Sequence, residues 1–144
     1  MEVEITLDGE VFKFHLGNEL KIVENKINNM VKTQPAGYGF ISMLHKRMLA
    51  KLRELERRKK STHSKLFLHH SSSRTTKFYK ANNKYPNKDL AAASAEQDKK
   101  YQRIIREITR IESNISILEV CVRSMELKSN LLQTLSSNVR KERN

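Results

Sequence analysis

The sequence predicts a mainly α-helical protein. We expect a long antiparallel helical hairpin of the coiled-coil type, with a small N-terminal β-hairpin, that assembles as a homo-oligomer. Apolar residues recur at alternating steps of three and four from Tyr101 to Val139, the pattern of a helix packed lengthwise on other helices. The 144 residues include only four Gly, two Pro and no Trp, which is typical of an elongated helical protein with a thin core. A helix over residues 101–139 would be roughly 60 Å long, so its apolar stripe needs a second long helix, other copies of the chain, or both.

Residues 3–16 predict a two-stranded β-hairpin. Two runs of alternating apolar and polar residues flank Asp8-Gly9. This residue pair supplies the positive φ angles of a tight type I′ turn. A hairpin of two strands is marginally stable alone, so we expect it to pack on another element.

A short amphipathic helix is predicted next, over about residues 19–32. Its apolar side chains recur at 3-4-3 spacing: Leu20, Val23, Ile27 and Met30. Pro35 should end this helix, because proline disfavours the helical conformation in the residue before it. We therefore predict one domain over 1–34, the hairpin and short helix, and a second over 35–144, the helical hairpin.

A second long helix is predicted over about residues 38–70, and Tyr38 and Phe40 at its start should pack on the β-hairpin. Beyond Leu55 its apolar spacing leads to Lys59 and Thr62. Burying such a basic run would be very costly, so this end of the helix must emerge into solvent or onto a ligand.

Residues 71–88 predict a loop or a partly disordered arm, with turn signals at Asn82-Asn83 and Pro86-Asn87. The last helix should start near Asp89, continue unbroken to about residue 140 and pack antiparallel on the helix of residues 38–70.

The apolar seam of the last helix is the predicted oligomerisation surface. It consists of Ile104, Ile108, Ile111, Ile115, Leu118, Val122, Met125 and Leu132. Ser129 and Ser136 also occupy seam positions. Either they set the register or oligomeric state, or the seam ends near Met125. Cys121 lies beside the seam, where we expect a small buried residue.

The charge of the chain is concentrated in its middle third. The formal net charge is +12, and residues 46–88 contain 14 basic against two acidic side chains. A solvated helix face would mix the two signs, so a segregated basic block predicts a polyanionic partner.

Aromatic side chains are interspersed with these cations. Single-stranded nucleic acid is bound by cations that follow its phosphates and by rings on which its bases stack. The predicted nucleic-acid-binding residues are Arg57, Arg58, Lys59, Lys60, His63, Lys65, Arg74, Lys77, Phe78, Tyr79, Lys80, Lys84 and Tyr85. No groove-reading motif is present, so little sequence preference is expected. The alternative is a solvated loop whose three aromatic rings cover the edge of a core.

Other classes of function lack candidate residues. No phosphate-binding glycine loop, nucleophile elbow or pair of carboxylates occurs, so we expect neither an enzyme nor a cofactor. His63, His69 and His70 lack the helical spacing of metal ligands, so no metal site is expected. A single cysteine fits a reducing cytosol. Neither an apolar signal block nor a membrane-spanning run is evident, so we expect a cytoplasmic protein without a membrane partner.

Five features occur in an order that matches a known family. They are Pro-x-x-Tyr from Pro35, an aromatic at Phe40, a Leu/Glu/Lys-rich helix over residues 49–56, the basic motif His63-Ser64-Lys65-Leu66, and Tyr85-Pro86-Asn87 before a heptad helix entered through Asp98 and Tyr101. Over residues 35–139 the chain thereby resembles the phage recombination mediator proteins of the UvsY type.

The resemblance implies a protein of DNA recombination and repair, in the host cytoplasm if phage-encoded. Such a protein binds single-stranded DNA and helps a recombinase displace the single-strand-binding protein. It also implies a ring of six or seven subunits. Lys65 matches the family's DNA-contacting Arg, and His63 stands where a Lys is expected, which weakens that phosphate contact. The alternative function is a structural or scaffold coiled-coil protein whose basic loop docks an acidic protein partner.

Overall fold

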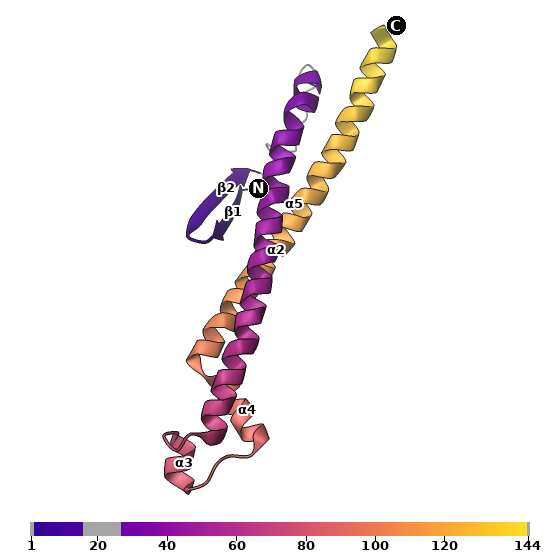
Figure 1. The fold of residues 1–144 in the computed structure, drawn as a ribbon. Coiled ribbons are helices and arrows are strands. Elements are labelled where there is room, and N and C mark those ends of the chain that lie inside the picture. The colour runs from indigo at the N-terminus through magenta and orange to yellow at the C-terminus, as the bar shows by residue number, and fades with distance from the viewer. Residues whose placement is uncertain (1, 16–26, 144) are drawn as a thin grey trace. The chain divides into compact units, whose positions relative to one another are not determined.

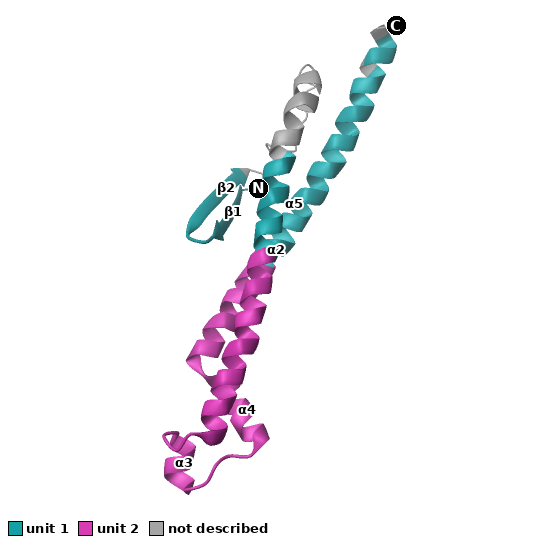
Figure 2. Cartoon of the chain, viewed as in Figure 1, with its two compact units in different colours: residues 1–49, 113–144 teal, residues 50–112 magenta. Residues whose placement is uncertain are grey.

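The computed structural model describes residues 2–15 and 27–143 and is mainly helical. The elements in chain order are β1 (Glu2–Leu7), β2 (Glu10–His15), α2 (Ile27–Ser72), α3 (Lys77–Asn82), α4 (Lys88–Gln97) and α5 (Lys99–Arg143) (Figure 1). The chain divides into two compact units. Unit 1 comprises residues 1–49 and 113–144, and unit 2 comprises residues 50–112 (Figure 2).

The predicted β-hairpin is confirmed. Strands β1 and β2 pair antiparallel, and the turn between them has positive φ angles at Asp8 (50°) and Gly9 (80°). This is the backbone conformation that the Asp-Gly pair favours. Because side chains alternate along a strand, Val3, Ile5 and Leu7 lie on one face of β1, and all three are buried.

Contacts from Phe12 on β2 connect this hairpin to α2. Its ring centroid lies 5.9 Å from that of Phe40, and the Arg47 guanidinium lies 5.8 Å from the same ring. The prediction that Phe40 packs on the hairpin is therefore confirmed. Tyr38, which was predicted to pack there too, contacts α5, where its hydroxyl donates a 2.8 Å hydrogen bond to Glu126 Oε1.

The predicted helix end at Pro35 is wrong, because α2 continues through this residue. A proline inside a helix removes one backbone hydrogen bond and crowds the preceding turn, at a cost of about 3 kcal/mol. That local cost is outweighed where the helix is anchored by packing, and Ile41 and Leu44 are buried soon after the proline. The apolar side chains predicted for residues 20–30 lie outside the described side chains. The domain division at residue 35 falls within α2 and stays a prediction.

In unit 1, α2 and α5 pack antiparallel. Tyr38 bonds to Glu126, and His45 Nε2 lies 3.7 Å from Glu119 Oε1, so residue numbers rise on one helix as they fall on the other. The side chains buried in this part of the two helices are Ile41, Leu44, Met48, Ile115, Leu118, Cys121, Met125 and Leu132. The α-helical repeat read from the sequence therefore supplies the core of the unit.

The seam of α5 follows the predicted positions with one local shift. Cys121 is fully buried and the adjacent Val122 only half-buried, although Val122 was the predicted seam residue. The apolar stripe of a packed helix is wide enough for neighbouring positions to exchange in this way. The seam does not end near Met125, because Ser136 is also buried and α5 continues to Arg143. Burial raises the pKa of the Cys121 thiol above its ordinary value, as expected for an inert buried cysteine.

The predicted loop over residues 71–88 contains a helix, α3, that the sequence did not predict. Thr76 caps its start, with its side-chain oxygen accepting a 3.2 Å hydrogen bond from the Tyr79 amide. Asn83 caps its end in the left-handed conformation, at φ 50°, and donates its backbone N–H to the Tyr79 carbonyl. Both caps satisfy terminal backbone groups, so six residues suffice for a helix.

The last helix is not continuous, contrary to the prediction. Asp98 adopts an extended conformation (ψ 140°) and separates α4 from α5. Its Oδ1 accepts a 2.8 Å hydrogen bond from the Lys100 amide, and its carbonyl accepts one from Gln102. An Asp side chain that binds backbone amides starts a new helix where an apolar residue would have continued the old one.

Candidate nucleic-acid interface

Unit 2 carries most of the charge of the chain. It contains 17 basic and seven acidic side chains, a formal net charge of +10 out of the total +12. Every residue predicted to bind nucleic acid belongs to this unit. The sequence-derived candidates therefore lie in one compact body, on α2 and around α3.

The cations of α2 follow directly on its last fully buried leucine, Leu55. Arg57, Arg58, Lys60 and Lys65 are exposed, whereas Lys59 is half-buried. Among the residues that the structure describes, none of these five side chains forms an ion pair. Because these side chains are not held in ion pairs there, they can contact a bound polyanion.

Two tyrosines near α3 form a stacked pair. The ring centroids of Tyr79 and Tyr85 lie 4.9 Å apart at an interplanar angle of 43°, and Tyr85 is 44% exposed. The Arg74 Nε donates a 3.4 Å hydrogen bond to the Tyr85 hydroxyl, and this bond raises the pKa of Arg74. Lys80 and Lys84 beside the pair are exposed. A ring surface with cations around it is the arrangement that binds a base and its phosphates.

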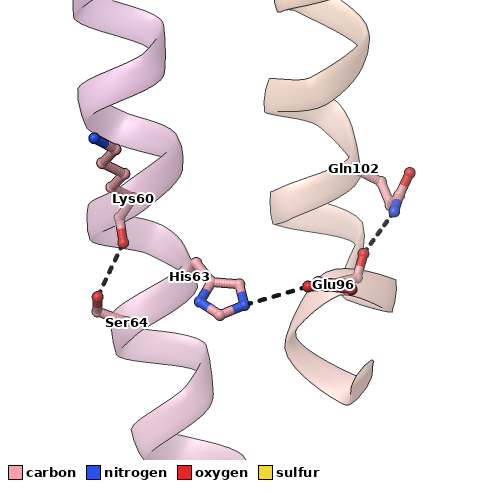
Figure 3. Close-up of polar contacts among 5 residues, drawn as sticks. All are labelled: Lys60, His63, Ser64, Glu96 and Gln102. Atoms are coloured by element: carbon pink, nitrogen blue, oxygen red, sulfur yellow. Dashed lines mark hydrogen bonds and ion pairs between the residues drawn. The ribbon is translucent and has the colours of Figure 1, made fainter. Parts of the chain in front are cut away.

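His63 occupies a different position from the other predicted residues. Its Nε2 lies 3.7 Å from Glu96 Oε1 on α4 (Figure 3). Its ring packs edge-on against Tyr101, with the ring centroids 5.6 Å apart. The backbone carbonyl of Glu96 in turn accepts a 2.5 Å hydrogen bond from the side-chain amide of Gln102. The imidazole therefore connects α2 to α4 and α5 within unit 2, and its predicted contact with phosphate stays a prediction.

A cavity of about 670 Å³ lies beside α3 in the same unit. It is formed by the end of α2, by α3 and its preceding loop, and by α4. Its lining includes His69, His70, Thr76, Phe78, Asn82 and Ser94. Phe78, together with Lys77, which also lines the cavity, was among the predicted site residues. The others were missed because the cavity depends on α3, whose one sequence signal is a capping Thr followed by a capping Asn seven residues later.

Phe78 thus separates from the two tyrosines with which the sequence grouped it. It lines the cavity and is half-buried, while Tyr79 and Tyr85 stack on each other. In the described part of the chain, no group of three or more His, Cys, Asp or Glu side chains is placed to hold a metal ion.

Comparison of the chain with protein-family models, curated protein sequences and solved structures finds no match. Within residues 2–15 and 27–143, no helix has both the length and the apolar character of a membrane span.

Proposed function

We propose that this protein binds single-stranded DNA and acts as a recombination mediator. The observation that carries the proposal is the set of exposed cations on α2, none of which is neutralised by an ion pair among the described residues. Such a set attracts a phosphate backbone whatever the base sequence, because the attraction comes from release of condensed counterions.

The cations and the aromatic rings of the interface bind different chemical groups of the strand. Cations of α2 and around α3 contact phosphates, and the tyrosine pair offers a surface on which a base stacks. The Arg74 guanidinium, which is always charged, is held next to that pair by its hydrogen bond to the Tyr85 hydroxyl. Binding of this kind lacks base readout and suits a protein that acts on any single strand.

As a mediator, the protein would make strands coated by single-strand-binding protein accessible to a recombinase. The test is the DNA-dependent ATPase rate of a recombinase on such coated strands. We expect addition of this protein to raise the rate severalfold, and a variant with glutamine at Arg57, Arg58, Lys60 and Lys65 to leave it unchanged. Stimulation by both proteins alike would contradict the assigned site. Assembly without any DNA affinity would support the scaffold alternative instead.

We further propose that the protein self-associates through α5, by a face other than the predicted seam. Six of the eight predicted seam residues are buried within the single chain, and Ile104 and Val122 are half-buried. A second apolar stripe remains exposed on α5 in unit 1. It consists of Ile117 (37% exposed), Val120 (53%), Leu127 (66%) and Leu131 (50%).

This stripe fits a second copy of the same chain. With Ser124 between Val120 and Leu127, its steps are three, four, three and four, the spacing of a helix that packs on another helix. The stripe is also nearly symmetric about Ser124, so a two-fold axis there places Ile117 opposite Leu131 of the copy. A surface that is complementary to itself in this way pairs isologously. Ring formation, as implied by the resemblance, needs a further contact.

Replacing Leu127 with lysine tests the pairing face. The new charge would be desolvated in the interface, so we expect the mass measured by light scattering to fall to that of the single chain. The control is Leu68→Lys, the same change at a similarly exposed leucine (63%) in unit 2, which should leave the mass unchanged. An unchanged mass for Leu127→Lys, with the wild type oligomeric, would place the interface elsewhere.

A further inference from the structure

The cavity beside α3 has the size and the lining of a ligand site. Its volume of about 670 Å³ lies within the range of about 300–1,000 Å³ that is usual for small-molecule pockets. Phe78 and the His69 and His70 imidazoles supply flat rings to its wall, and the two imidazoles pack edge-on against each other at 5.2 Å.

Polar side chains of this lining have hydrogen-bonding capacity to spare. The Asn82 amide nitrogen donates to the Phe78 carbonyl, which leaves its side-chain oxygen as an acceptor. The Thr76 oxygen accepts from the Tyr79 amide, which leaves its hydroxyl as a donor. Hydrogen bonds to the Asn82 oxygen and from the Thr76 hydroxyl would orient a ligand in the cavity.

We propose that this cavity holds one unstacked nucleobase of the bound single strand. A base is flat, has an aromatic face for the rings, and carries both donors and acceptors along its edge for Asn82 and Thr76. Lys77, which also lines the cavity and is exposed, is the cation that would contact the adjacent phosphate.

An isolated phosphate or other anion fits the site less well. Lys77 is the one Lys or Arg in the lining, and Phe78 and Ala81 are apolar. A phosphate would instead be drawn to the exposed cation run of α2. The proposal rests on the proposed DNA binding and adds to it a site whose contribution depends on the presence of a base, whichever base it is, and not on charge.

The test fills the cavity without changing the charge. Ala81 lines it from α3, so Ala81→Leu places a larger side chain in the space that a base would take. The control is Ala93→Leu, an exposed alanine on α4 that is not part of the lining. Each protein is titrated against two oligonucleotides of equal length and charge, one of thymidine and one in which every base is replaced by an abasic sugar.

We expect Ala81→Leu to weaken binding of the thymidine strand by at least about fivefold, the loss of roughly one stacked base. Binding of the abasic strand should not change, and Ala93→Leu should match the wild type on both strands. Equal thymidine affinities for the wild type and Ala81→Leu would overturn the base site while leaving DNA binding intact. An equal loss on both strands would also overturn it, since the effect would not depend on a base. Failure of the wild type to bind either strand would instead remove the proposed function itself.

Discussion

Glutamine at Arg57, Arg58, Lys60 and Lys65 will lower the affinity for oligo-dT by about 100-fold or more near 0.1 M salt. All four side chains are exposed on α2 and are outside the ion pairs of the described residues. Each phosphate contact on a single strand contributes about 0.7 to the slope of log affinity against log salt, so losing four should reduce that slope by about 3. Glutamine is an uncharged polar residue with a helix propensity close to those of Arg and Lys, so the helix itself should persist.

The matched control removes the same charge from unit 1. Lys46, Arg123, Arg140 and Lys141 are exposed cations of that unit, and their replacement by glutamine gives a protein of the same net charge. We expect this variant to keep the wild-type salt slope. If both variants lose affinity equally, then the net charge of the chain, and not the surface on α2, governs binding.

Leu118→Ala will destabilise unit 1 by about 2–5 kcal/mol. Leu118 is fully buried on α5, and its removal leaves a space in the thin core between α5 and α2. The free energy of unfolding is measured by urea denaturation followed by circular dichroism, at one fixed protein concentration, because self-association would add to apparent stability.

The control for this prediction is the same substitution at an exposed leucine. Leu68 on α2 is 63% exposed, so Leu68→Ala should change the free energy of unfolding by no more than about 0.5 kcal/mol. Equal destabilisation by the two changes would mean that the seam of α5 does not form the core in solution.

The parts of the fold that depend on local chemistry were predictable from the sequence. The Asp8-Gly9 pair specifies the turn whatever surrounds it, and the structure has positive φ angles at both residues. The helical repeat of residues 101–139 likewise specifies which face is buried. Leu118, Met125 and Leu132 are each no more than 1% exposed.

The errors arose where a local preference competed with its surroundings. Pro35 signals a helix end, yet α2 continues through it because the following turns are held by packing. The residues around Asp98 suit a helix, so their pattern predicted no break, and only the resemblance placed a helix entry at this residue. Its carboxylate caps the start of α5. Cys121, and not Val122, is the fully buried seam residue. Which of the two is buried depends on how the partner helix packs, and the spacing of apolar residues does not determine it.

The parts of the candidate site that follow from local composition were predictable from the sequence. The cations of α2 and the tyrosines could be identified because they cluster along the chain. The cavity could not be, because its lining residues come from three separate elements and meet only once α3 has formed. His63 was included because the resemblance places it at a Lys position of a basic motif, whereas its side chain contacts Glu96 and Tyr101.

The central claim is that the exposed cations of unit 2 bind the phosphates of a single DNA strand. It is tested most directly by measuring the affinity of the wild-type protein for oligo-dT across a range of salt concentrations. We expect tight binding at low salt and a linear fall of log affinity with log salt, steep enough for at least four phosphate contacts. Absence of binding at low ionic strength, or an affinity that does not change with salt, would contradict it.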